Sequence, residues 1–514
     1  MTVVAHAATP VRYGSRWLLA GLVVVIVFVV ARWAAVPYVV GVFHDDGIYA
    51  LLARSIASGE GFHHSHLVGN PAATHYPPLY PLVLAAAWRI APDFPANVSA
   101  LLGLNAALLA AAALGWWCFV TERLGLAAAA AAAGSIAATL TSAVLVLSGA
   151  LLSEPLFMAL LFPALLACER AAECTDRRGV AIAGLCTGVL VLARTHALAL
   201  LLALVLVLLA RRRWRDALVA LAVCAVVQLP WVVWTRGAAP RVPAPLEGAY
   251  GSYVGWFLTG VREGGAPFVG ATARVNAHES WLLLRDRLAF GFFAPLQALT
   301  LVAVVTAVLV GAWAFVRRAP VTIAFLTLYL GVVMLWPYAP WRFVWAIWPL
   351  VAMLVMQGVR ACWERRGATR MVVGVAAALV GFAFLRTELH AYATRSWRIP
   401  AQQAAHQIQP AIDWVHRNTA ASDVVLSDGE QVIALYAERR AAPPIDFSAR
   451  EYLAPPQGAE GATRLSAMLG AVPARYVIVL APSLVASADA LAHRRPGLRR
   501  IEPLAGGAVY EVVR

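Results

Sequence analysis

The sequence of 514 residues is short of charge and contains no lysine. Only 13% of its residues are charged, about half the share found in an average soluble domain. This composition excludes an ordinary soluble protein. Because lysine is absent, any phosphate that the chain binds must be held mainly by arginine.

Cysteine is also scarce, and its pattern indicates neither a disulfide framework nor a zinc site. The six cysteines are spread along the chain, and no two of them form a CxxC pair. They are Cys118, Cys168, Cys174, Cys186, Cys224 and Cys362. Scattered cysteines of this kind usually serve as small apolar packing residues, and we interpret them in that way.

The net charge of +14 raises the question of nucleic-acid binding. Such binding requires basic side chains that are gathered on one surface. Here the arginines occur instead in short clusters between long apolar runs, a distribution that membrane topology explains. The sequence therefore does not favour a nucleic-acid partner.

Long apolar runs dominate the sequence, which is 61% hydrophobic. The run from Trp17 to Phe43 contains a single charge, Arg32, and the run from Leu126 to Leu152 contains none. Such runs exceed a typical buried helix and suit a hydrocarbon layer of about 30 Å. Because lipid offers no hydrogen bonds to the backbone, we expect these runs to be helices. The alternation that is typical of a β-barrel is lacking.

The apolar runs predict an α-helical, polytopic membrane protein with about eleven transmembrane helices. The expected spans cover residues 17–37, 98–120, 125–146, 152–169, 179–194, 196–210, 216–235, 293–316, 320–336, 341–359 and 371–388. The first run follows Arg12 and Arg16 and has no clear cleavage site, so we interpret it as an uncleaved signal anchor.

The arginine clusters between the spans predict the orientation of the chain. If the N-terminus is cytoplasmic, every dense cluster falls in a cytoplasmic loop. These arginines are Arg123, Arg170, Arg177, Arg178, Arg211, Arg212, Arg213, Arg215, Arg317, Arg318, Arg360, Arg365, Arg366 and Arg370. An odd number of spans then places the C-terminus outside. The sequence therefore predicts a multi-pass protein of the cell (inner) membrane.

Three longer segments are expected on the outer face, namely residues 38–97, residues 236–292 and the tail 389–514. We divide the chain into a transmembrane module, residues 1–388, and an outer domain, residues 389–514. Helices are expected at Asp46–Ser58 and Tyr76–Ile90, lying at the membrane interface, and in the tail at Gln402–Asn418, Glu430–Arg439 and Thr463–Leu469. Strands are expected at Val424–Leu426, Tyr476–Leu480 and Ala508–Val513, so the tail is predicted to be a small α/β domain.

The strongest candidate for chemistry is the acidic pair Asp45-Asp46, which follows the first span directly. Ionisable side chains so close to the membrane are costly and usually functional. A carboxylate there can act as a general base or bind a divalent cation. A structural interpretation is also open, because an aspartate before a helix can cap its N-terminus, and both roles can coexist.

A second polar segment, Thr74–Pro81, brings His75 and Tyr76 to the same outer region. We interpret its prolines as fixing the start of a helix. The nearby run His63–His66 (HHSH) lacks the number and spacing of ligands that a zinc site requires. We expect this run to be an exposed loop.

These motifs together resemble those of the GT-C glycosyltransferases. The acidic pair, the segment Tyr76–Pro81 (YPPLYP) and the segment Ser153–Leu156 (SEPL) carry the resemblance. More narrowly, the chain is similar to the family 39 group, which includes protein O-mannosyltransferases and the aminoarabinose transferases that modify lipid A. The resemblance covers roughly residues 15–390 in layout, with the specific motifs mostly in the first part, and the tail matches only loosely.

The resemblance implies a reaction and a set of roles. Such enzymes take a sugar from a polyprenyl-phosphate donor in the membrane and transfer it, with inversion, to a lipid, glycan or protein acceptor on the outer face. By this resemblance, Asp45 is the base that deprotonates the acceptor, and Asp46 supports it. Members of the family often have lysine immediately before the Tyr-Pro-Pro segment. This chain has His75 there, which is only partly charged at neutral pH and leaves the contact with the leaving group open.

Arginine must then supply most of the charge that binds the donor phosphate. Arg194 ends a predicted span at the outer surface, and Arg342 begins another in the segment Tyr338–Phe343; relatives tend to have an arginine near both places. Tyr338 and Tyr76 are further candidates for substrate binding, as is Glu154, whose burial near the membrane would be costly without a cavity. For the arginines, simple snorkelling of a helix-end side chain to the interface is the alternative.

Two other classes of protein remain open. A transporter or lipid flippase would show polar or Gly/Pro-broken spans at mid-membrane, often in paired halves, whereas here the polar residues cluster at the outer ends. A non-catalytic scaffold of an envelope complex would have no need for the acidic pair beside His75. The sequence predicts no certain cofactor and leaves room for a divalent cation at the acidic pair.

Overall fold

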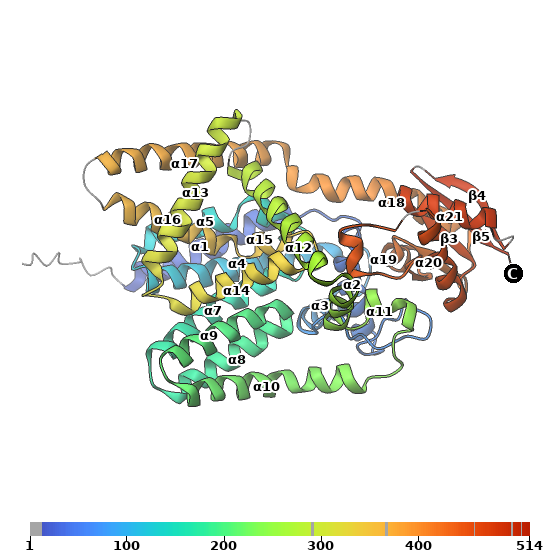
Figure 1. Ribbon diagram of the computed structural model, residues 1–514, viewed down its shortest axis with the longest axis horizontal. Helices are drawn as coiled ribbons and strands as arrows, with labels where there is room; N and C mark the ends of the chain where they lie inside the picture. The colour runs from blue at the N-terminus through green and yellow to red at the C-terminus, as the bar shows by residue number, and fades with distance from the viewer. Residues whose placement is uncertain are drawn as a thin grey trace, which may run out of the picture.

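The computed structural model describes residues 13–288, 292–364, 368–456, 458–494, 497–504 and 506–513. Figure 1 shows a helical body that occupies most of the long axis and, at one end of that axis, a smaller part that contains a β-sheet. Two arginines of the charge argument, Arg365 and Arg366, lie outside the described residues, as does Arg12 before the first apolar run.

Long apolar helices form the body. In the described part of the chain, six helices are long and apolar enough to cross a membrane, or up to seven if one bent pair is counted as a span. The six are α1 (Tyr13–Ala34), α4 (Val98–Arg123), α7 (Glu154–Glu173), α10 (Trp214–Gly237), α13 (Ala294–Phe315) and α17 (Ala368–Thr394). The bent pair is α5 (Ala128–Thr139) and α6 (Ser142–Ser148), whose axes differ by 67°. The chain is therefore a mostly helical multi-pass membrane protein, as predicted.

The remaining predicted spans also fall on helices, but these helices are shorter. They are α8 (Arg177–Ala193), α9 (Leu198–Ala210), α14 (Pro320–Leu335), and the pair α15 (Trp341–Ala346) and α16 (Trp348–Trp363). At 1.5 Å per residue, the 13 residues of α9 cover only about 20 Å, less than the hydrocarbon layer. The structure thus supports six or seven spans, and the full number of about eleven stays a prediction.

The outward faces of the long helices are apolar. Leu229 and Val233 on α10 are 56% and 60% exposed, and Leu299 and Leu309 on α13 are 59% and 64% exposed. A continuous apolar surface of this kind suits lipid rather than water. It agrees with the low charge of the sequence.

The segment between α1 and α4 contains the two predicted outer helices, α2 (Asp45–Ala57) and α3 (Leu79–Ile90). They were expected to lie at the membrane interface, but nine of the 13 residues of α2 are buried. The reason is that α2 packs on one side against α3 and on another against α19 of the tail. The helix α2 therefore lies between the helical body and the tail.

The second outer segment, residues 236–292, is largely helical. It contains the short turn η2 (Ala244–Leu246), α11 (Glu247–Tyr250) and the long helix α12 (Tyr253–Leu288). Non-helical dihedral angles at Gly265 (φ 59°, ψ −156°) break α12, and Pro267 follows the break. Such residues can mark a bend inside a helical segment without ending it.

The tail contains a five-stranded mixed sheet with flanking helices, as Figure 1 shows. Its elements are η3 (Ser396–Arg398), α18 (Ile399–Asn418), β1 (Val424–Ser427), α19 (Glu430–Val432), η4 (Ile433–Ala437), β2 (Arg440–Ala442), η5 (Ala449–Tyr452), α20 (Gly458–Ala471), β3 (Tyr476–Val479), α21 (Pro482–Arg494), β4 (Leu498–Leu504) and β5 (Gly507–Val512). The strand order is β2-β1-β3-β5-β4. β1 pairs in parallel with β2 and β3, and β5 pairs antiparallel with β3 and β4. The predicted small α/β fold of the tail is thus present.

One hydrophobic core joins the tail to the outer helices. Ile48 and Leu51 of α2 belong to the same buried cluster as Leu426 of β1 and Val477 of β3. Alternate residues of the strands face the other side of the sheet, where Val425 packs in a cluster with residues of α18. Because the core is shared, the tail is held directly against α2.

Candidate functional site

The site begins at the N-terminus of α2. His44 precedes the helix with φ 63° and ψ −68°, a conformation that is uncommon for a residue other than glycine. The next residue, Asp45, accepts a hydrogen bond from the Tyr76 hydroxyl at 2.8 Å on Oδ1 and from Arg342 at 2.6 Å on Oδ2. Its carboxylate is therefore used for contacts across the site and does not cap the helix.

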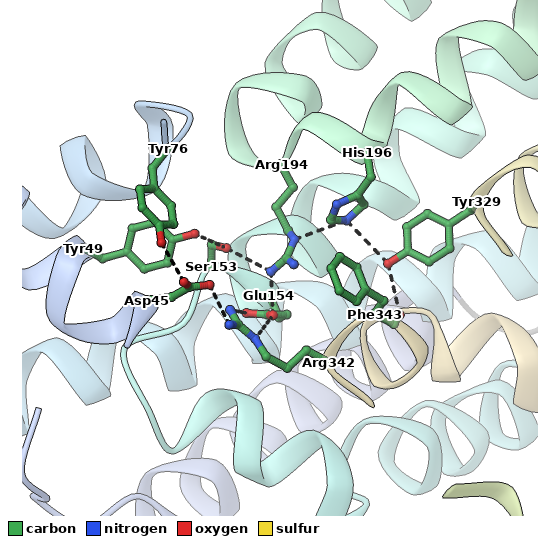
Figure 2. Close-up of polar contacts among 10 residues, drawn as sticks. All are labelled: Asp45, Tyr49, Tyr76, Ser153, Glu154, Arg194, His196, Tyr329, Arg342 and Phe343. Atoms are coloured by element: carbon green, nitrogen blue, oxygen red, sulfur yellow. Dashed lines mark hydrogen bonds and ion pairs between the residues drawn. The ribbon is translucent and has the colours of Figure 1, made fainter. Parts of the chain in front are cut away.

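Arg342 lies at the centre of the charged residues (Figure 2). It stands at the start of α15 and donates to Asp45 through one nitrogen and to Glu154 through Nε at 2.7 Å. Arg194 forms a further ion pair with Glu154 at 2.6 Å. The result is a row of alternating charges, Asp45–Arg342–Glu154–Arg194, in which the two guanidinium groups balance the two carboxylates; Glu154 and Arg194 are buried, and Asp45 and Arg342 are partly exposed.

The electrostatics of this row act on Asp45. Burial alone would raise the pKa of the Asp45 carboxyl, but the Arg342 guanidinium and the hydrogen bond from Tyr76 lower that pKa below its ordinary value. Asp45 is thus ionised in this state, and its negative charge is shared with Arg342. A ligand that bound the Arg342 guanidinium in place of Asp45 would raise the pKa of the Asp45 carboxyl.

Asp46 points away from this row. Its oxygens accept from the Tyr38 hydroxyl at 2.7 Å and from the backbone N–H groups of Gly41 at 2.9 Å and Phe43 at 3.0 Å. Burial raises the pKa of Asp46, and these hydrogen bonds oppose the rise. Asp46 therefore fixes the turn that leads into α2, and any support that it gives Asp45 is positional.

Several residues of the site were not predicted as site residues, although Ser153 belongs to the SEPL segment named above. Ser153 accepts from Arg194 at 3.1 Å and contacts the Tyr49 hydroxyl at 3.2 Å. His196 Nε2 accepts from Arg194 Nε at 3.2 Å, and Tyr329 lies 3.5 Å from the same nitrogen. These neighbours hold the Arg194 side chain in one position. No motif joins them, because they come from separate helices.

His75 and Tyr338 lie beside the charged row without joining it. His75 is 5% exposed. Its Nδ1 lies 2.9 Å from the Gly251 carbonyl oxygen, to which it can donate a hydrogen bond. Burial lowers the pKa of His75 to about 4, so the ring is neutral at neutral pH and adds no positive charge for a phosphate. Tyr338 packs against Trp256, with ring centroids 5.4 Å apart.

A cavity of about 680 Å³ opens next to these residues. Its lining includes Asp45, Arg194 and Arg342. Of the other predicted site residues, His75, Tyr76 and Tyr338 also line it, whereas Asp46 and Glu154 do not. The tail contributes Asp428, Glu430, Pro443, Pro444, Ile445, Asp446, Phe447, Glu451 and Leu484, none of which was predicted as a site residue.

The two carboxylates at which the sequence left room for a divalent cation point in different directions. Asp45 and Asp46 turn to different partners, and among the described residues no group of three or more metal-ligating side chains is placed to hold a metal ion. The run His63–His66, expected as an exposed loop, is largely buried, since His64 is 0% and His66 is 3% exposed. It is covered because Tyr250 packs against both rings.

Comparison with known proteins bears on the fold of this chain. No protein-family model matches the chain. No curated protein matches its sequence. Among solved structures, however, the whole arrangement of helical body, outer helices and tail is similar to that of ArnT.

Two of the matching structures are those of ArnT from Cupriavidus metallidurans. The structure of ArnT bound to undecaprenyl phosphate is 13% identical, with a TM-score of 0.52, over 97% of this chain and 98% of the other. The apo structure of ArnT is 12% identical, with a TM-score of 0.50 and the same coverage. At this identity the likeness concerns the fold, and it confirms the fold that the motifs predicted.

Proposed function

We propose that this chain is an inverting glycosyltransferase that transfers a sugar from a polyprenyl-phosphate donor to an acceptor. The observation that carries the proposal is the contact between Asp45 and Arg342 in the wall of one cavity, with Arg194 nearby. This places a base beside cationic groups, as a direct displacement at a sugar phosphate requires. The ArnT structure bound to undecaprenyl phosphate supports the choice of donor.

The proposed reaction is a single displacement. Asp45 removes the proton of an acceptor hydroxyl, and the resulting oxygen attacks the anomeric carbon of the donor sugar. The bond between that carbon and the phosphate oxygen breaks, and its electron pair leaves with the polyprenyl phosphate. Arg342 and Arg194 stabilise the charge that develops on this leaving group.

The ion pair between Asp45 and Arg342 implies that the donor binds before Asp45 acts as a base. Without donor, Arg342 is shared between Asp45 and Glu154. A bound phosphate would compete for the guanidinium, and Asp45 would then lose the neighbour that lowers its pKa. The base thus becomes strong only after the donor has bound.

The proposal includes a location. About eleven spans, with the N-terminus in the cytoplasm, would put the tail and the cavity on the outer side of the cell membrane. There a donor could enter from the membrane, and the acceptor would be a lipid, a glycan or a protein. Membrane lipids are further partners in this arrangement.

The test uses the full chain in lipid nanodiscs. Binding of undecaprenyl phosphate is measured first, and transfer of a labelled sugar from undecaprenyl-phosphate sugars to envelope extract is measured second. We expect both for the wild type. We also expect mass spectrometry of envelope glycolipids and glycoproteins to show a lost sugar after deletion of the gene. Failure to bind undecaprenyl phosphate, together with an unchanged envelope, would overturn the proposal.

A further inference from the structure

Glu430 is a buried acid that the proposed reaction does not use. It begins α19 in the tail, is 2% exposed and lines the same cavity as Asp45 and Arg342. The walls of this cavity differ in charge. Both of its arginines, Arg194 and Arg342, come from the body, whereas four of its five carboxylates come from the tail.

Three of these four tail acids already have a structural role. Asp428 accepts from the backbone N–H groups that precede α21, at distances between 2.7 and 3.1 Å. Asp446 and Glu451 both pair with Arg464. Glu430 is the fourth tail acid of the cavity. Within the described residues, no arginine or histidine forms an ion pair with it.

Neutral donors hold the Glu430 carboxylate in place. The Tyr250 hydroxyl donates to Oε1 at 2.9 Å, and Gln431 Nε2 donates to the same oxygen at 2.7 Å. In the part of the chain that the structure describes, Oε2 receives no hydrogen bond from another residue. A buried carboxylate with one unused oxygen and no cation is costly, and such groups concentrate at ligand sites.

The position of α19 is fixed closely relative to the base. Gln431 Nε2 lies 2.8 Å from Nδ1 of His44, the residue before Asp45. A Cβ atom at Gly47 would stand 2.6 Å from Gln431 Cβ, so the backbone of α2 at Gly47 lies directly against the Gln431 side chain of α19. The tail therefore presents Glu430 at a defined place in the cavity.

We propose that Glu430 binds a hydrogen-bond donor of the transferred sugar, a ring hydroxyl or an ammonium group, and thereby selects the sugar. The inference rests on the proposed function. The donor phosphate binds at Arg194 and Arg342, and the attached sugar then extends into the same cavity toward the tail. Carboxylate oxygens accept hydrogen bonds only, so Glu430 suits the donor groups of a sugar and not a second phosphate.

The test compares two kinds of lipid in nanodiscs that contain the full chain. One is undecaprenyl phosphate without sugar, and the others are undecaprenyl phosphates that carry a neutral hexose, a neutral pentose or an amino sugar. For Glu430→Gln we expect unchanged binding of the bare lipid. For the sugar-bearing lipid that the wild type binds best, we expect affinity to fall by about tenfold or more.

The exposed Glu438, on the same segment, provides the matched control Glu438→Gln, which should bind every lipid as the wild type does. Equal affinities of wild type and Glu430→Gln for each sugar-bearing lipid would overturn the inference. An equal loss for bare and sugar-bearing lipids would also overturn it. If Glu430→Gln does not fold, Glu430→Asp is measured in the same way. If the wild type itself does not bind the bare lipid, the proposed function fails instead.

Discussion

Asp45 and Asp46 show how neighbouring residues acquire different roles. Asp45 shares its charge with Arg342 across the cavity, while Asp46 accepts hydrogen bonds from its own turn. The two side chains separate because adjacent residues on a helix point about 100° apart. In the proposed function Asp45 is therefore the residue that meets the acceptor, whereas Asp46 holds the turn that leads into α2.

Replacement of Asp45 by asparagine should abolish transfer with little effect on folding. The asparagine amide cannot take up the proton of the acceptor hydroxyl. Removal of a general base typically lowers the rate by a factor of about 10² to 10⁴. Transfer of labelled sugar is the measurement, with thermal unfolding in detergent as the check on folding. Asp46→Asn is the matched control: it should lower the unfolding temperature more than Asp45→Asn does. A rate for Asp45→Asn within about threefold of wild type would contradict the role given to Asp45.

The ion pair with Arg342 makes a prediction about pH. Arg342 lowers the pKa of Asp45, so in the wild type kcat/KM should fall only below the ordinary aspartate range, as Asp45 becomes protonated. In Arg342→Gln, burial is no longer opposed by the positive charge, and the pKa of Asp45 should rise. The acid limb of kcat/KM should therefore move to higher pH.

The control for this measurement is Arg318→Gln, which alters an exposed arginine before α14 that does not line the cavity. Its acid limb should coincide with that of the wild type. An acid limb in Arg342→Gln at the wild-type position would show that Asp45 is not the group that titrates.

The sequence predicted the charged members of the site better than their contacts. Asp45, Glu154, Arg194 and Arg342 were found because charges near a membrane are rare and stand out. Glu430 was not found, since acids are common in the polar tail and only the fold brings this one to the cavity. The neutrality of His75 likewise depends on burial, which no local pattern reports.

At the scale of elements, strands and helices with strong apolar patterns were predicted well. β1, β3 and β5 are buried and apolar, and each lies close to its predicted range. β4 was missed because it is an edge strand with a mostly exposed, charged sequence that includes Pro503. β2 was missed because its three residues are too few to form a pattern.

The contact between α2 and α19 leads to a prediction at the same scale. In Gly47→Ala, the added Cβ atom would lie 2.6 Å from Gln431 Cβ and 2.8 Å from Gly41 Cα, so the two elements must separate. Overpacking of this kind typically costs about 1–3 kcal/mol. We expect a lower unfolding temperature and slower sugar transfer, because the separation also displaces Glu430.

Gly270→Ala is the control for this change. Gly270 lies in α12 with open space around the position of an added Cβ atom. Its replacement should leave transfer unchanged and should not lower the unfolding temperature. If Gly47→Ala behaved like Gly270→Ala in both measurements, the close packing of α19 would not matter for the site.

At the scale of the whole molecule, the tail and the body act as one unit. The tail shares a hydrophobic core with α2, and it provides one wall of the cavity whose other wall carries Arg342. The site is complete only when the two are joined. The side of the membrane on which the tail lies therefore decides which acceptors can reach Asp45.

The orientation can be tested with single cysteines in a variant that lacks the six native ones. Arg318→Cys lies after α13 in a predicted cytoplasmic loop, and Arg499→Cys lies on β4 of the tail; both native side chains are exposed. If the charge clusters orient the chain as predicted, a membrane-impermeant thiol reagent should label Arg499→Cys in intact cells with a permeable outer membrane. It should label Arg318→Cys only after lysis. The reverse pattern would place the cavity on the cytoplasmic side, where an acceptor on the outer face could not reach Asp45.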